Sequence, residues 1–134
     1  LLGIPYGLII GFLSVPPETP TTYGNLMGMT AFHVLAEQLF FMAFVGRSLL
    51  KSMPEPVPAV VLTALIFGLH QLTFFATLGA PTPAMLTGTL QVAAFGGGAY
   101  AFLLWRSGGI LAPMLAHLVV HATMMTRAVL VTMS

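Results

Sequence analysis

The amino-acid sequence predicts an all-α integral membrane protein, a polytopic bundle of transmembrane helices. Only 5% of its 134 residues are Asp, Glu, Lys or Arg, whereas a soluble domain carries about a quarter. The apolar fraction is 57% and the mean hydropathy is +0.99. The apolar residues also form long runs, as expected for helices that need about 20 residues to cross a bilayer. Lipid is therefore the expected solvent of most of this surface.

Prolines, glycines and polar residues divide the chain into five apolar segments. Clustered prolines cannot continue a helix, so the proline-rich stretches mark connections between helices. The first segment is short for a full span. We expect about five spanning segments in one domain, and because the chain begins on Leu1 within an apolar run, we expect that domain to belong to a longer chain. The predicted segments are residues 1–15, 23–50, 57–78, 84–105 and 109–133.

The few basic residues predict the orientation of the bundle. If successive segments alternate in direction, Arg47, Lys51 and Arg106 fall on one side of the membrane. Cytoplasmic loops are enriched in Lys and Arg, so the loops carrying Lys51 and Arg106 are predicted to be cytoplasmic. Arg127 falls on the other side and is the one exception. Trp105 is predicted to anchor its helix at the membrane interface.

Composition excludes several classes of site and partner. The chain has no cysteine, which excludes disulfides, thiolate metal sites and a cysteine nucleophile. Four basic residues cannot build a nucleic-acid-binding surface, so lipid and membrane proteins are the expected partners. Glycines 96–98, with Gly88 before them, predict a close approach between helices.

Apart from Arg47 and Arg127 near helix ends, one glutamate and four histidines lie within the predicted helices. A charge at the bilayer centre costs at least about 2.5 to 3.5 kcal/mol. Counting residues from the basic ends at a rise of roughly 1.5 Å per residue places Glu37, His70 and His117 roughly 15 to 20 Å deep. Three separate helices thus bring a carboxylate and two imidazoles to one layer. His33 and His121 each lie one turn away, four residues from Glu37 and His117 respectively.

Two chemistries fit this cluster. In the first, Glu37 acts as a general base on water while imidazoles orient the water and stabilise an oxyanion. In the second, a metal ion is bound by residues drawn from His33, Glu37, His70, His117 and His121. The zinc motif H-E-x-x-H is absent, and the sequence identifies no cofactor.

Three short segments occur in a recognisable order and spacing. They are Ala-Glu-Gln-Leu-Phe-Phe at 36–41, Ile-Phe-Gly-Leu-His at 66–70, and the glycine-rich start and two histidines of residues 108–121. These segments resemble the motifs E-E-x-x-x-R, F-x-x-x-H and H-x-x-x-N of the CPBP family of intramembrane proteases, of the CAAX-prenyl-protease and bacteriocin-processing type. The resemblance covers about residues 31–123. It implies that Glu37 is the catalytic glutamate, that His70 helps it to activate water, and that His117 and His121 lie at the oxyanion.

Four positions depart from these motifs. Gln38 replaces the second glutamate, Met42 the arginine, Ile66 the phenylalanine and His121 the asparagine. His121 can still donate a hydrogen bond, and Ile66 still fills apolar space. The change at position 42 matters more, because a buried Glu–Arg pair would hold the helix geometry. Loss of both partners together leaves no orphan charge.

Three functions therefore compete. The first is an intramembrane endopeptidase that uses Glu37 and His70 on a scissile carbonyl. The second is a catalytically lapsed relative, serving as a structural or assembly subunit of a larger membrane complex, which Gln38 and Met42 favour. The third is a binding protein whose histidines ligate a metal, haem or pigment. The sequence does not identify a substrate, a preference for prenylated substrates or an oligomeric state.

Overall fold

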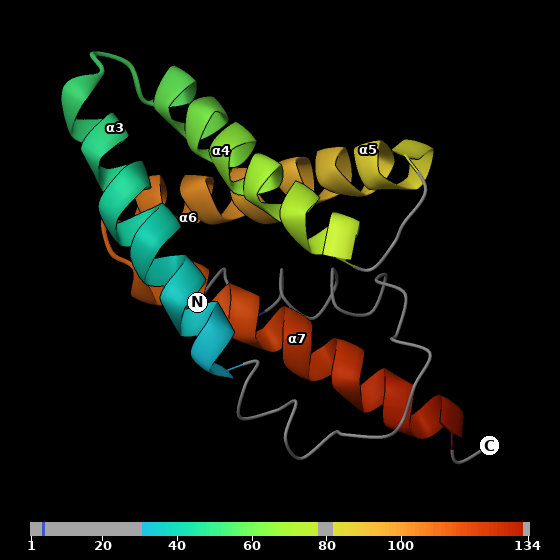
Figure 1. Cartoon of the computed structure of the whole chain (residues 1–134). Coiled ribbons are helices and arrows are strands. Elements are labelled where there is room, and N and C mark those ends of the chain that lie inside the picture. Colours follow the sequence, from blue (N-terminus) through green and yellow to red (C-terminus); the bar gives the residue numbers. More distant parts are fainter. Residues whose placement is uncertain (1–3, 5–30, 78–81, 133–134) are drawn as a thin grey trace.

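The computed structural model describes residue 4, residues 31–77 and residues 82–132 (Figure 1). Within these residues all regular secondary structure is helical, which confirms the predicted all-α class. The helices form four continuous stretches. The first, Ala31–Ser52, contains the π-helix η1 (Gln38–Gly46) and ends in α3 (Arg47–Ser52); the others are α4 (Pro56–Thr77), the run of α5 (Thr82–Gln91), η2 (Val92–Gly98) and α6 (Ala99–Ser107), and α7 (Leu111–Thr132).

These stretches coincide with the last four predicted segments to within a few residues, where both are described. The segment predicted at residues 1–15, and the start of the one at 23–50, lie outside the described residues. α4 begins at Pro56, whose fixed φ suits the first turn of a helix. α6 ends because Gly108 adopts a φ of 68°, and its N–H donates to the carbonyl of Leu104 at 2.9 Å.

Among the described helices, two are long and apolar enough to cross a membrane: Ala31–Ser52 and Pro56–Thr73. Leu111–Met124 is apolar but shorter. The run from α5 to α6 begins with several threonines and then carries three successive glycines, so it is less apolar than a typical span. The structure therefore supports two candidate spans, and five spans remain a prediction.

The outer surface carries many large apolar side chains. Phe44 is 66% exposed and Leu90 is 65% exposed, and leucines and phenylalanines of every described stretch share this property. An extended apolar surface of this kind is rare on soluble monomers and suits contact with lipid. The exposed side chains also include Leu39, Phe40, Val57, Val61, Leu65, Leu69, Leu86, Phe95, Phe102 and Leu111.

Small residues allow α4 to pack closely across η2 (Figure 1). A Cβ atom added to Gly97 would lie 3.0 Å from both the Cα and the carbonyl oxygen of Ala64. A Cβ atom added to Gly68 would lie 2.5 Å from the Cβ of Ala93. Both distances are shorter than ordinary carbon contacts of about 3.5 to 4.0 Å. The close approach predicted from the glycine run is confirmed, and we call Ala64, Gly68, Ala93 and Gly97 the glycine seam.

The hydrophobic core lies beside this seam. Met42 of η1 and Phe67 of α4 are almost completely buried, and they pack with Tyr100 and Leu104 of α6. The ring of Phe67 meets those of Phe41 and Tyr100 edge to face, with centroids 5.3 and 6.1 Å apart. Ala116 of α7 belongs to the same core, which thus joins all four described helical stretches immediately next to the candidate site.

Candidate active site

Glu37 is the last residue before the π-helix η1, and its side chain is only 5% exposed. π-helical turns are rare and frequently occur at functional sites. Here the wider turn changes the register of the helix directly after Glu37, as shown by the N–H of Arg47, which donates to the carbonyl of Met42 five residues earlier. A buried carboxylate at such a position requires polar partners.

Four polar side chains supply those partners. The Nε2 atoms of His33 and His70 lie 3.1 and 3.4 Å from Oε1 of Glu37, and Nε2 of Gln71 donates to the same oxygen at 2.8 Å. Nε2 of His117 lies 3.8 Å from Oε2. The structure thus brings Glu37, His70 and His117 together, as the depth count predicted, with one residue from each of three helical stretches. We call these residues, with His33, Gln38, Gln71 and His121, the glutamate cluster.

The cluster has a buried side and an open side. Glu37, Gln38 and His117 are buried, whereas His33 is 57% exposed and His70 is 42% exposed. The two exposed imidazoles flank Oε1 of Glu37. The carboxylate thus lies at the boundary between two exposed imidazoles and the buried side chains of Gln38 and His117.

Gln38 and Glu37 together set the protonation of the His117 ring. Nε2 of Gln38 lies 2.9 Å from Nδ1 of His117, so the amide donates and Nδ1 accepts. A neutral imidazole carries one proton, which we therefore assign to Nε2. That proton faces the carboxylate of Glu37, which favours this tautomer over one that directs a lone pair at the anion. In this arrangement Oε1 of Gln38 is buried and unpaired among the described residues.

His121 joins the cluster through His117. Its Nε2 atom lies 3.1 Å from Nε2 of His117, and it accepts from His117 in the tautomer just assigned. His121 lies one helical turn along α7 from His117, as the four-residue spacing predicted, and it is partly buried. Its contact with the imidazole, rather than with Glu37, places it behind the groups nearest the carboxylate.

Aromatic rings fix the orientation of the imidazoles. Tyr100 stacks on His117 with centroids 4.7 Å apart, and Phe67 meets the same ring edge to face at 6.2 Å. The ring centroid of Phe41 lies 4.9 Å from that of His70. The sequence comparison drew attention to Ile66 as the replaced motif phenylalanine, but the structure shows that the buried neighbour Phe67 packs on His117, while Ile66 lies at the edge of the core.

The two positions of the first motif at which a neutral residue replaces a charged one, Gln38 and Met42, have different surroundings. Gln38 lies within the glutamate cluster and binds His117. Met42 is fully buried in the hydrophobic core between Phe41, Tyr100 and Leu104. An apolar side chain has therefore replaced the motif arginine in an apolar environment, and the helix geometry at this position is held by packing.

The arrangement of the histidines bears on the metal-binding alternative. Within the described residues, no group of three His, Cys, Asp or Glu side chains is arranged to hold a metal ion. Nε2 of His33 and of His70 instead lies close to Oε1 of Glu37, and His121 is hydrogen-bonded to His117.

Two members of the site were missed in the sequence. Gln71 makes the shortest contact with Glu37, and Tyr100 makes the closest ring contact with His117. Gln71 had a usable signal, because it is a polar residue in the middle of an apolar helix and follows His70 directly. Tyr100 had none, since aromatic residues are common throughout the chain.

Comparison with known proteins identifies one family. The chain matches the sequence model described as type II CAAX prenyl endopeptidase Rce1-like over residues 19–123. This match includes all three motif segments. No curated protein and no solved structure matches the chain significantly.

Proposed function

This chain belongs to the Rce1-like family of type II CAAX prenyl endopeptidases, and we propose that it is an active intramembrane endopeptidase that uses Glu37 as its general base. Membership agrees with the resemblance to CPBP proteases that the three motifs carried, and the family is membrane-embedded. The observation that carries the proposal is the buried carboxylate of Glu37 with imidazoles from two other helices beside it.

In the proposed reaction, Glu37 removes a proton from water as the water oxygen bonds to the scissile carbonyl carbon. The carbonyl electron pair moves onto its oxygen to form an oxyanion. Collapse of this intermediate breaks the C–N bond, and the proton passes from Glu37 to the leaving nitrogen. Oε1 is held by His33, His70 and Gln71. Among the described residues, Oε2 has only the longer 3.8 Å contact with His117, so we assign the water to this oxygen.

His117 is the donor that we assign to the oxyanion. Its Nε2–H lies on the Oε2 side of Glu37, next to the proposed water. Gln38 keeps Nδ1 unprotonated and so holds the Nε2–H tautomer, while His121 provides a resting partner for that proton in the absence of substrate. Preorganised donors at a developing negative charge supply a large part of catalysis in such sites.

The alternative of a catalytically lapsed subunit rested on Gln38 and Met42. Gln38 has a specific partner in the cluster, and Met42 fits an apolar core. The polar partners that Glu37 has among the described residues, His33, His70, Gln71 and His117, are all present beside these two substitutions. Both are therefore compatible with an active site, and nothing in the described residues points to a structural partner in a larger complex.

The decisive experiment is cleavage of a prenylated CAAX-type peptide by the purified protein in lipid vesicles. Glu37→Gln should reduce turnover to the uncatalysed background, because the amide keeps the shape of the side chain but cannot accept a proton from water. Glu55→Gln is the matched control, since Glu55 is exposed in the connection between α3 and α4. Equal activity of the two variants, or an inactive native protein, would contradict the proposal.

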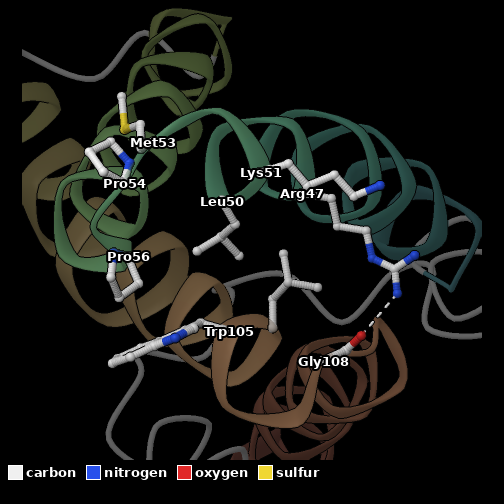
Figure 2. Close-up of a pocket in the computed structure, with 9 residues that line it drawn as sticks. Arg47, Leu50, Lys51, Met53, Pro54, Pro56, Trp105 and Gly108 are labelled. Carbon is white, nitrogen blue, oxygen red and sulfur yellow. Dashed lines mark hydrogen bonds between the residues drawn. The ribbon is translucent and has the colours of Figure 1, made fainter.

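We also propose that the chain crosses the membrane several times with Lys51 and Arg106 on the cytoplasmic side. Lys51 at the end of α3 lines one pocket with Trp105 (Figure 2), and Trp105 directly precedes Arg106 in the last turn of α6. The sequence has no cysteine, so single cysteines can be introduced at positions 51 and 106 without background. An impermeant thiol reagent should label both only from the cytoplasmic side. Labelling from outside intact cells would reverse the topology.

A further inference from the structure

A hollow lies at the basic end of the bundle, and none of the residues that line it belongs to the glutamate cluster. It has a volume of about 470 Å³ and lies between the end of α3, the start of α4 and the turn after α6 (Figure 2). This size falls within the roughly 300 to 1,000 Å³ typical of small-ligand sites. Its lining residues are Arg47, Leu50, Lys51, Met53, Pro54, Pro56, Leu104, Trp105 and Gly108.

The polar side of this pocket is positively charged. Arg47 and Lys51 are four residues apart on one helix, so they share a face and repel each other. No lining residue is acidic, and no described carboxylate forms an ion pair with either cation. One guanidinium nitrogen of Arg47 donates to the carbonyl of Gly108 at 3.1 Å (Figure 2). That bond positions the guanidinium and leaves most of its five N–H donors available.

The remaining walls are apolar and interfacial in character. Leu50, Met53 and Leu104 provide hydrocarbon surface, and the half-exposed ring of Trp105 forms one side. Arg106 lies over the outer part of that ring, 5.7 Å from its centroid. Trp and Arg together are typical of the membrane–water boundary. A ligand that fits both walls carries an anionic group beside an apolar body.

We propose that this pocket binds the phosphodiester headgroup of an anionic phospholipid, with Arg47 and Lys51 on the phosphate and the glycerol region against Leu50, Leu104 and Trp105. Basic pockets between helices at the cytoplasmic side bind such headgroups in other membrane proteins. The anion also relieves the repulsion between the two cations. The site is separate from the glutamate cluster, so it stands or falls independently of the proposed protease activity.

Trp105 is the only tryptophan of the chain and lies in the pocket, so its fluorescence reports occupancy directly. The native protein is reconstituted in phosphatidylcholine vesicles that contain either brominated phosphatidylglycerol or brominated phosphatidylcholine. Bromine quenches a tryptophan that it contacts. We expect stronger quenching by the anionic lipid, from a higher apparent affinity for the pocket.

Lys51→Gln should weaken this preference about fivefold, the factor expected for one basic side chain at an anionic membrane surface. Arg106→Gln is the control for surface charge, because Arg106 is at the same end but does not line the pocket. Since Arg106 lies over the Trp105 ring, the preference is measured in each variant as the ratio of quenching by the two lipids. Circular dichroism verifies that both variants remain folded.

Three results would overturn the proposal. Equal quenching by the two lipids would show that the pocket has no preference for an anionic headgroup. An equal loss of the preference for anionic lipid in Arg106→Gln and Lys51→Gln would show that the preference arises from general surface charge. Abolition of the preference by millimolar inorganic phosphate, or by a peptide with a free C-terminal carboxylate, would assign the pocket to a soluble anion.

Discussion

The glutamate cluster and the glycine seam are both built on α4, yet they depend on opposite properties of the chain. At the cluster, polar side chains of α4 contact Glu37: Gln71 donates a hydrogen bond, and the imidazole of His70 lies 3.4 Å from the carboxylate. At the seam, Gly68 and Gly97 bring backbones together because they have no side chain. The glutamate cluster requires specific polar side chains, whereas the glycine seam requires residues without a side chain.

This difference separates activity from stability. A hydrogen bond to a catalytic carboxylate orients one group, so its loss should reduce turnover with little effect on folding. Close packing of two helices supports the whole bundle, because in lipid the association of helices rests on packing rather than on the hydrophobic effect. Changes at the seam should therefore lower the stability of the fold and leave the chemistry of the folded fraction intact.

Gln71→Leu should give the largest effect that tests this contrast between the glutamate cluster and the glycine seam, and the effect should be on turnover. Gln71→Leu removes the 2.8 Å bond to Glu37 and replaces an amide by an apolar side chain of similar size. Hydrogen bonds to charged groups are worth about 1.5 to 3 kcal/mol, so we expect turnover to fall about ten- to hundredfold. His33 and His70 still contact the carboxylate, so some activity should remain. Turnover and KM are measured with a prenylated peptide.

Gln91→Leu provides the matched control for Gln71→Leu. Gln91 is exposed at the end of α5, and the substitution is chemically identical. Its turnover should equal that of the native protein. If Gln71→Leu leaves turnover unchanged, Gln71 does not position Glu37. The same conclusion follows if a lower unfolding temperature, and hence a smaller folded fraction, accounts for the whole loss of turnover.

The sequence was sufficient to predict the helices and the convergence of the charged residues. Long apolar runs mark helices, and an ionisable residue within them is conspicuous, so the positions of Glu37, His70 and His117 could be compared by counting the rise per residue. Their partners were harder to predict. Gln71 is uncharged and therefore less conspicuous, and the stacking of Tyr100 on His117 depends on how α6 and α7 pack together.

Other features have no local signal in the sequence. The π-helices η1 and η2 have an extra residue in a turn. The residue composition of those two segments does not predict this. The pocket at the basic end joins residues about 60 positions apart, Arg47 and Gly108, through a turn whose position depends on the tertiary arrangement. The run from α5 to α6 is not one of the two candidate spans among the described residues, and it carries three threonines and Gln91 in α5 as well as the glycines of η2.

The smallest effect is expected at Gly97, and it tests the other half of the comparison. In Gly97→Ala the new methyl group would lie 3.0 Å from the backbone of Ala64, which cannot move away as a flexible side chain could. Overpacking costs about 1 to 3 kcal/mol, and the better helix propensity of alanine offsets up to about 1 kcal/mol of this. We expect a net loss of about 1 to 2 kcal/mol in unfolding free energy, measured by denaturation in detergent micelles. The turnover of the folded fraction should stay within about twofold of the native value, because the substitution touches no member of the glutamate cluster.

Gly109→Ala is the control, since a Cβ there meets no atom within 4 Å, and its stability should match that of the native protein. If Gly97→Ala instead reduces turnover and leaves stability unchanged, the seam and the cluster are coupled through α4, and the division between packing and chemistry fails.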